Sequence, residues 1–119
     1  MYWNQIVGKK REVFTREWLM KKGFILINQN WQCCYGELDI IASCFDQLHF
    51  IVVAIKAYGE WEASIQGITR RRMQSCKEAA QKYLKRHPEW REATFSSLTI
   101  AVSKKKSTEF ILSKEVMKP

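Results

Sequence analysis

The sequence predicts an α/β fold in which helices flank a mixed central sheet, with the elements in the order αβββαββ. Two long segments repeat apolar residues at helical spacing, and five shorter segments are rich in β-branched and other apolar residues. The composition, 46% hydrophobic and 13% aromatic, is typical of a folded domain rather than a disordered chain. At 119 residues the chain has room for one core, and we expect a single domain over residues 1–119.

Two helices are predicted, at residues 3–22 and 64–86. The first carries an apolar stripe at helical spacing, made of Trp3, Val7, Phe14 and Trp18, with Leu19 on its flank. Gly23 follows it and can take the left-handed conformation that closes a helix. The second carries an inward stripe made of Met73, Cys76, Ala80, Tyr83 and Leu84. Pro88 ends this helix, because proline cannot continue the hydrogen-bond pattern.

Five strands are predicted, at residues 24–27, 36–42, 48–56, 95–103 and 109–113. The first strand is loosened by the polar residues 28–30 that follow it. The second and third strands are apolar runs joined by the short polar stretch 43–47, which predicts a hairpin. The last strand is expected at an edge of the sheet.

Charged residues are rare in this hairpin, and two of them, Asp39 and Lys56, lie within its apolar runs. Because side chains alternate between the faces of a strand, Asp39 points away from Leu38 and Ile40. By the same alternation, Ala54 shares a face with Lys56. A single charge is costly to bury without a partner. The two charged residues are therefore expected either to pair with each other or to belong to a functional site.

The chain is strongly basic, with twenty Lys and Arg against twelve Asp and Glu, a formal net charge of +8 and a pI near 9.5. This excess favours an anionic partner, nucleic acid before a membrane surface, although a solvated basic surface explains it equally well. No segment approaches the roughly 20 apolar residues of a membrane span, and the N-terminal residues lack the features of a signal peptide. We expect a cytoplasmic protein with no membrane partner.

The four cysteines, Cys33, Cys34, Cys44 and Cys76, form no CxxC pair. Adjacent Cys33 and Cys34 do not suit a single metal at the usual zinc spacing. Reduced thiols are therefore favoured over a zinc site.

Several motifs of the chain together follow a family pattern. They are Gly8 with Glu12, Asn30-Trp31, Gly36-Glu37-Leu38-Asp39-Ile40-Ile41, Ile51-Val52-Val53-Ala54-Ile55-Lys56 and Ala79-Ala80-Gln81-Lys82-Tyr83-Leu84. Over residues 5–102 this pattern resembles the YraN-like family, small bacterial proteins of the restriction-endonuclease-like superfamily, similar in fold to archaeal Holliday-junction resolvases. Arg11 stands where the family's first motif has a second Gly, and Ala54 stands where the strand motif has Glu.

The resemblance implies a restriction-endonuclease-like fold and a nuclease-like site built from Glu12, Asp39, the missing Glu and Lys56. In such a site Asp39 and Glu12 are the metal ligands, and Lys56 orients water or neutralises developing charge. With Ala54 in place of the Glu, Asp39 and Glu12 alone would hold Mg²⁺ weakly. A solvated surface position is the alternative for Glu12 and for Lys56.

Arg70, Arg71 and Arg72, near the start of the second helix, are the predicted nucleic-acid-binding residues, together with Lys56. Arg72 takes the place of a Lys in the family pattern, and we expect it to point toward the sheet face that bears Asp39. Arg70 and Arg71 would then grip phosphate on either side. Three consecutive residues span much of a helix circumference, so a solvated basic face is the alternative.

Three functions are compatible with these residues. The first is a nucleic-acid-binding protein, with DNA the favoured partner, whose cleavage is impaired because Ala54 replaces the metal-binding Glu. The second is an active Mg²⁺-dependent endonuclease that acts on DNA, including branched DNA, with Glu60 or Glu62 as the replacement acid. The third is a non-catalytic interaction protein that forms a homodimer through its hairpins or an edge strand.

Overall fold

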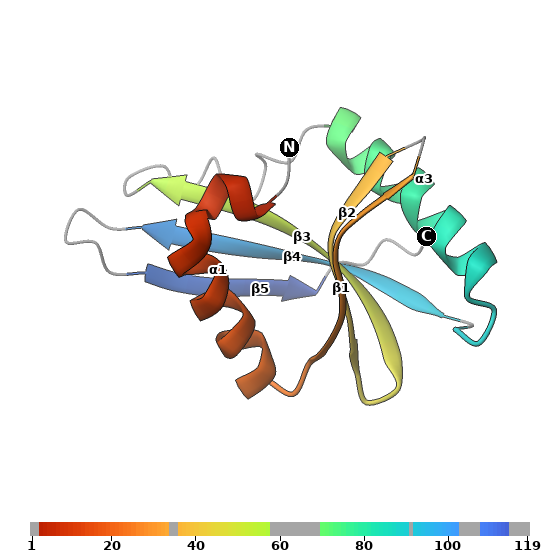
Figure 1. Cartoon of the computed structure of the whole chain (residues 1–119), viewed down its shortest axis with the longest axis horizontal. Coiled ribbons are helices and arrows are strands. Elements are labelled where there is room, and N and C mark those ends of the chain that lie inside the picture. The colour runs from red at the N-terminus through yellow and green to blue at the C-terminus, as the bar shows by residue number, and fades with distance from the viewer. Residues whose placement is uncertain (1–2, 34–35, 58–69, 91, 103–107, 115–119) are drawn as a thin grey trace.

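The computed structural model describes residues 3–33, 36–57, 70–90, 92–102 and 108–114, and confirms the predicted α/β class and element order. Among these residues the helices are α1 (Trp3–Lys21) and α3 (Arg70–Arg86). The five strands are β1 (Ile25–Cys33), β2 (Gly36–Cys44), β3 (Gln47–Ala57), β4 (Ala93–Val102) and β5 (Thr108–Lys114). They form one sheet in the order β1-β2-β3-β4-β5 (Figure 1).

The sheet is mixed, because β3 and β4 run parallel and the other neighbouring strands run antiparallel. A parallel pair needs a long crossover connection, and α3 lies in the segment of chain between β3 and β4. Neither described helix combines the length and the apolar character that a membrane span requires.

The two helices cover opposite faces of the sheet. Alternate residues of β3 belong to two separate cores: Phe50 and Val52 pack with the buried residues of α3, whereas Ile51 and Val53 pack with Leu19 of α1. The α3 contribution is buried, as its inward stripe predicted, and consists of Cys76, Ala79, Ala80 and Tyr83. Ala54 and Lys56 are even-numbered positions of β3, and strand alternation puts such positions on the face toward α3. The predicted site is therefore expected on that face.

The β1–β2 ribbon crosses from one core to the other near Asp39. Leu38 belongs to the core beneath α3, yet Ile40, two residues later, belongs to the core beneath α1. A regular strand would place both residues on one face. Asn30, in the facing part of β1, has a positive φ of 53°, a conformation that Asn tolerates better than most residues. In Figure 1 the two strands accordingly leave the rest of the sheet and run beside α3.

Two boundaries differ from the sequence prediction. β1 continues through the polar residues 28–30 as far as Cys33, because pairing with β2 holds them and a bulge between Leu26 and Asn28 absorbs the irregularity. The β2–β3 turn has only two residues, Phe45 and Asp46, and not the five that were predicted. The predicted start of the second helix, residues 64–69, lies outside the described residues.

The apolar stripe predicted for the first helix is partly wrong. Phe14 is 47% exposed, whereas Thr15, which was not predicted, is buried. Leu19, predicted on the flank of the stripe, is buried. The side chains of Trp3 and Val7 lie outside the described residues. Trp18 is half-buried and packs against the core beneath α1, as predicted.

Gly36, the first residue of β2, lies against the backbone of α3. A Cβ atom at this position would come far inside van der Waals contact of the Ser75 carbonyl oxygen. The absence of a side chain therefore allows β2 to start directly beneath the helix.

The substitution Gly36→Ala is expected to lower the free energy of unfolding by about 3 kcal/mol, because neither backbone can move away cheaply. Equilibrium urea unfolding measures this loss. Gly23→Asn is the control: a Cβ atom there would meet nothing nearer than Cys44 Sγ, at 3.8 Å, so only the backbone conformation is penalised, at about 1 kcal/mol or less. Equal losses for the two variants would contradict the close approach.

Candidate functional site

Asp39 lies in β2 with only 3% of its surface exposed. Its Oδ2 atom accepts a hydrogen bond from the backbone N–H of Val53 in β3, at 2.9 Å. The ladder between the two strands ends at the pair Ile40 and Ile51, just before this point. The carboxylate therefore takes the place of a strand carbonyl as the acceptor for β3, where the ribbon turns away.

Arg72, in the first turn of α3, reaches the same carboxylate oxygen. Its Nη2 atom lies 2.5 Å from Asp39 Oδ2, which makes a charge-assisted hydrogen bond within an ion pair. The Arg72 side chain remains 31% exposed. Arg72 thus points toward the face that bears Asp39, as predicted, and one oxygen atom of Asp39 joins β2 to both β3 and α3.

The electrostatics of the site are dominated by burial. Burial raises the pKa of Asp39, the charge of Arg72 and the Val53 N–H lower it, and the nearby charge of Glu37 raises it slightly; the net direction is upward. Burial also raises the pKa of the Cys76 thiol to about 12, and the Asp39 charge adds to that shift. Cys76 therefore stays protonated and is not available as a thiolate ligand.

Position 54 offers no oxygen ligand beside this carboxylate. Ala54 is half-buried, follows Val53 directly and lies opposite Thr99 of β4. Among the described residues, no group of three His, Cys, Asp or Glu side chains is placed to hold a metal ion. Since Arg72 and Val53 already use Asp39 Oδ2, the described residues do not fit a Mg²⁺ site of the nuclease type.

Within the described residues, none of the other predicted site residues is joined to Asp39. Glu12 is half-buried in α1, the helix on the opposite face of the sheet, and within the described part of the chain no hydrogen bond or ion pair joins it to Asp39. Lys56 pairs with Ala101 in the β3–β4 ladder. The side chains of Lys56 and Arg70 lie outside the described residues, and Arg71 is exposed.

The sequence prediction gave Asn30 no role beyond its place in the family motif Asn30-Trp31. Its neighbours Gln29 and Trp31 pair with Ile40 and Leu38, so Asn30 stands opposite Asp39 across the β1–β2 ladder. Its Oδ1 atom is buried and finds no hydrogen-bond partner among the described residues. The sequence held one signal for this conformation: Asn tolerates a left-handed backbone better than most residues, and Asn30 ends the polar stretch 28–30.

Comparison with known proteins places the chain in a family. The model of the uncharacterised protein family UPF0102 matches residues 11–111. The chain belongs to this family. A UPF0102 protein of Dictyoglomus thermophilum is 31% identical over 102 residues, 85% of this chain and 86% of the relative. A UPF0102 protein of Pseudomonas syringae pv. syringae is 30% identical over 86 residues, 72% of this chain and 70% of the relative. The resemblance to the YraN-like family is thereby confirmed, and the names of these UPF0102 relatives state no activity.

The ion pair leads to a stability prediction. Arg72→Ala leaves a buried carboxylate with one hydrogen bond, and we expect it to lower the free energy of unfolding at pH 7 by about 1–3 kcal/mol. Because Asp39 then loses the charge that lowers its pKa, that pKa should rise further, and a ¹³C NMR titration of the carboxyl carbon measures the rise.

The sign of the pH dependence follows from the raised pKa. An aspartate with a raised pKa in the folded state contributes stability below the unfolded value of 3.8, and this contribution is lost as the pH rises through the folded value. The difference between Arg72→Ala and the unsubstituted protein should therefore shrink as the pH falls. Arg71→Ala, an exposed neighbour, is the control and should change stability by less than about 0.5 kcal/mol. A pH-independent loss would contradict the pairing.

Proposed function

We propose that this protein binds nucleic acid through the outer face of α3, on a nuclease-like scaffold whose cleavage is impaired. The observation that carries the proposal is a basic helix that covers the buried carboxylate and neutralises it with its own Arg72. α3 holds seven Lys or Arg residues and one Glu, so this helix alone supplies six of the eight net positive charges.

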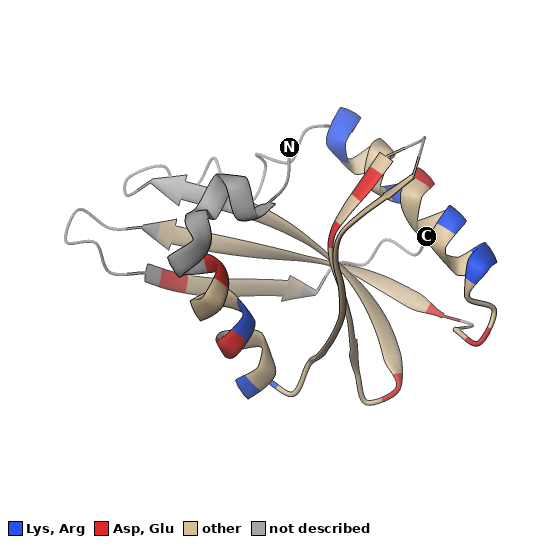
Figure 2. Cartoon of the chain, in the orientation of Figure 1, with Lys and Arg blue, Asp and Glu red and all other residues tan. Residues whose placement is uncertain are grey.

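Several basic side chains of α3 face outward, where phosphate can reach them. Arg71, Lys85 and Arg86 are exposed, and Figure 2 displays the blue segments along this helix. Arg86 also lies over the Trp31 ring, 5.8 Å from its centroid, which holds the guanidinium beside an aromatic surface. Cations spaced along one helix face can contact successive phosphates of a nucleic-acid backbone.

The ligands and the charge of the site both disfavour efficient cleavage. Mg²⁺ at such a site would have to displace Arg72 from Asp39 Oδ2, and Ala54 supplies no second oxygen. A guanidinium can balance the carboxylate charge, but unlike Mg²⁺ it does not coordinate a water molecule that could attack the phosphodiester. The replacement acids Glu60 and Glu62 lie outside the described residues, so an active endonuclease is retained as an outcome of the test.

Binding is tested by fluorescence anisotropy with four-way junction, flap, duplex and single-stranded DNA at several salt concentrations. For three or four phosphate contacts, the slope of log Kobs against log [salt] on duplex DNA should be about −3 to −4. Arg71→Ala and Lys85→Ala should each reduce the magnitude of that slope by about one.

Lys21→Ala is the matched control, because it removes one exposed positive charge from α1 and not from α3. We expect it to leave the slope unchanged. If Lys21→Ala reduced the slope equally, net charge alone would drive binding. DNA binding with an affinity that does not depend on salt would contradict the proposal.

Cleavage and metal binding are tested separately, on the same DNA substrates in millimolar Mg²⁺. The protein should leave all four substrates intact. Ala54→Glu adds a carboxylate beside Asp39 and should tighten Mg²⁺ binding in calorimetry by on the order of tenfold, equivalent to about 1.4 kcal/mol. Ala54→Gln, of equal size but uncharged, should not.

Two results would contradict this account of the site. Cleavage by the unsubstituted protein that Asp39→Ala abolishes would establish the active endonuclease. Unchanged Mg²⁺ binding in Ala54→Glu would mean that position 54 is not beside the metal-binding carboxylate.

A further inference from the structure

The turn between β2 and β3 holds a bulky residue in an unfavourable conformation. Phe45 and Asp46 both have positive φ, 50° and 63°. A two-residue hairpin turn of this kind favours Asn and Gly, because a Cβ atom is crowded there. Phe45 therefore occupies a position that costs the fold free energy, and such outliers are a reason to look for a function.

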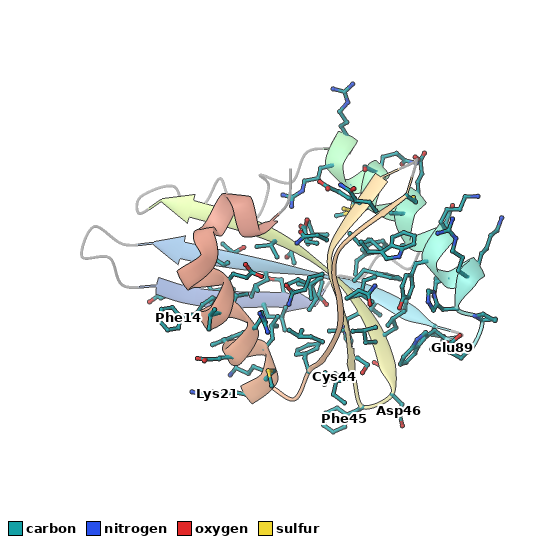
Figure 3. The ribbon with its side chains drawn as sticks, viewed as in Figure 1. Phe14, Lys21, Cys44, Phe45, Asp46 and Glu89 are labelled. Atoms are coloured by element: carbon teal, nitrogen blue, oxygen red, sulfur yellow. The ribbon has the colours of Figure 1, made fainter. Side chains whose placement is uncertain are left out.

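The Phe45 ring gains little from its own chain in return. It is 94% exposed, more than the other exposed large hydrophobic residues, of which Ile25 at 68% and Met20 at 62% come next. Figure 3 shows its side chain directed away from the ribbon at the tip of the hairpin, beside Asp46. A strained and exposed aromatic residue is suited to insertion into a partner.

A hollow that could receive such a ring lies beside the same hairpin. It has a volume of about 770 Å³ and is lined by Trp18, Phe24 and Phe110, with Phe45 itself at its edge and Lys22 among its polar residues. A smaller hollow of about 380 Å³ shares Trp18 and Phe110 and extends along α1 to Phe14. The two together make an apolar surface, hereafter the hairpin patch, that runs from the β2–β3 turn across α1 to β5.

The hairpin patch carries charges of both signs. Asp46 follows Phe45 at the tip, and the exposed Lys22 lines the larger hollow. A surface that offers a protruding ring, a hollow, an anion and a cation can be complementary to itself. We infer that a second copy of this chain binds the hairpin patch about a two-fold axis, so that each Phe45 enters the hollow of the other copy and each Asp46 meets Lys22 of the partner subunit.

Charge also argues against nucleic acid as the occupant. Asp46, Glu89 and Glu92 line a neighbouring pocket, so the tip of the hairpin lies at an acidic end of a basic protein. Phosphate would be repelled there. Two copies of a chain with a net charge of +8 repel each other overall, so a dimer depends on the local contacts of the hairpin patch. A stable interface takes about 800 Å² from each partner, roughly a tenth of the 7,891 Å² surface of this chain.

The test is the mass of the full-length protein in solution, measured without DNA by sedimentation velocity from micromolar to millimolar concentration. The unsubstituted protein should be a dimer that dissociates on dilution. Phe45→Gly should raise the dimer Kd by at least about thirtyfold, while its unfolding midpoint in urea stays equal or rises, because Gly accepts the positive φ. Met20→Gln, which removes an exposed apolar side chain elsewhere on α1, should leave the Kd unchanged.

A charge swap identifies the contact. Asp46→Lys and Lys22→Glu should each weaken the dimer, and the two substitutions in one chain should restore it. A monomer at millimolar concentration, an unchanged Kd in Phe45→Gly, or a double variant no better than either single variant would overturn the inference. A monomer whose DNA binding falls in Phe45→Gly would also overturn it, and would assign the tip to nucleic acid. Because the mass is measured without DNA, failure of the proposed function would leave this result unaffected.

Discussion

One oxygen atom of Asp39 holds together three elements of the fold, β2, β3 and α3. It accepts the Val53 N–H where the β2–β3 ladder ends, and it binds Arg72 of α3. Burial of this carboxylate costs free energy, and the two partners offset part of that cost. Together with the side-chain-free contact of Gly36 beneath Ser75, the pair fixes the first half of α3 against the β1–β2 ribbon. The arrangement of the site is therefore inseparable from the packing of the helix.

The same constraint accounts for the chemistry that we propose. In a magnesium nuclease, a carboxylate pair must remain open to a cation that brings its own water. Here one acid position is Ala54, and the remaining acid, Asp39, carries a single charge that one guanidinium can balance. Ala54 and the pairing of Asp39 with Arg72 are thus consistent with each other: with one carboxylate at the site, a single guanidinium balances its charge. The proposed binding to nucleic acid would then rest on the positive charge of α3 and not on a metal site.

Local patterns in the sequence predicted most of the fold, and long-range contacts account for what they missed. Helical spacing identified Cys76, Ala80 and Tyr83 as buried. Strand alternation was right that Asp39 points away from Ile40 but wrong for Leu38, because the ribbon crosses between the cores and leaves both Leu38 and Asp39 on the side of α3. The continuation of β1 through residues 28–30 could not be predicted, because it depends on pairing with β2 and on the left-handed backbone of Asn30. The choice of Arg72 among three consecutive arginines depends on the phase of a helix whose described part begins at Arg70.

Departures from local rules have two different causes in this chain, and burial distinguishes them. Asn30 has a positive φ where the ribbon crosses between two cores, so the surrounding packing repays its strain, and Asn is a residue that tolerates it. Phe45 has the same backbone conformation at a solvent-exposed tip, where neither burial nor residue type compensates for it. Such a residue is a reason to look for a compensating contact outside the described chain. A second copy bound through the hairpin patch would supply that burial, and it would leave the basic face of α3 to act on its own partner.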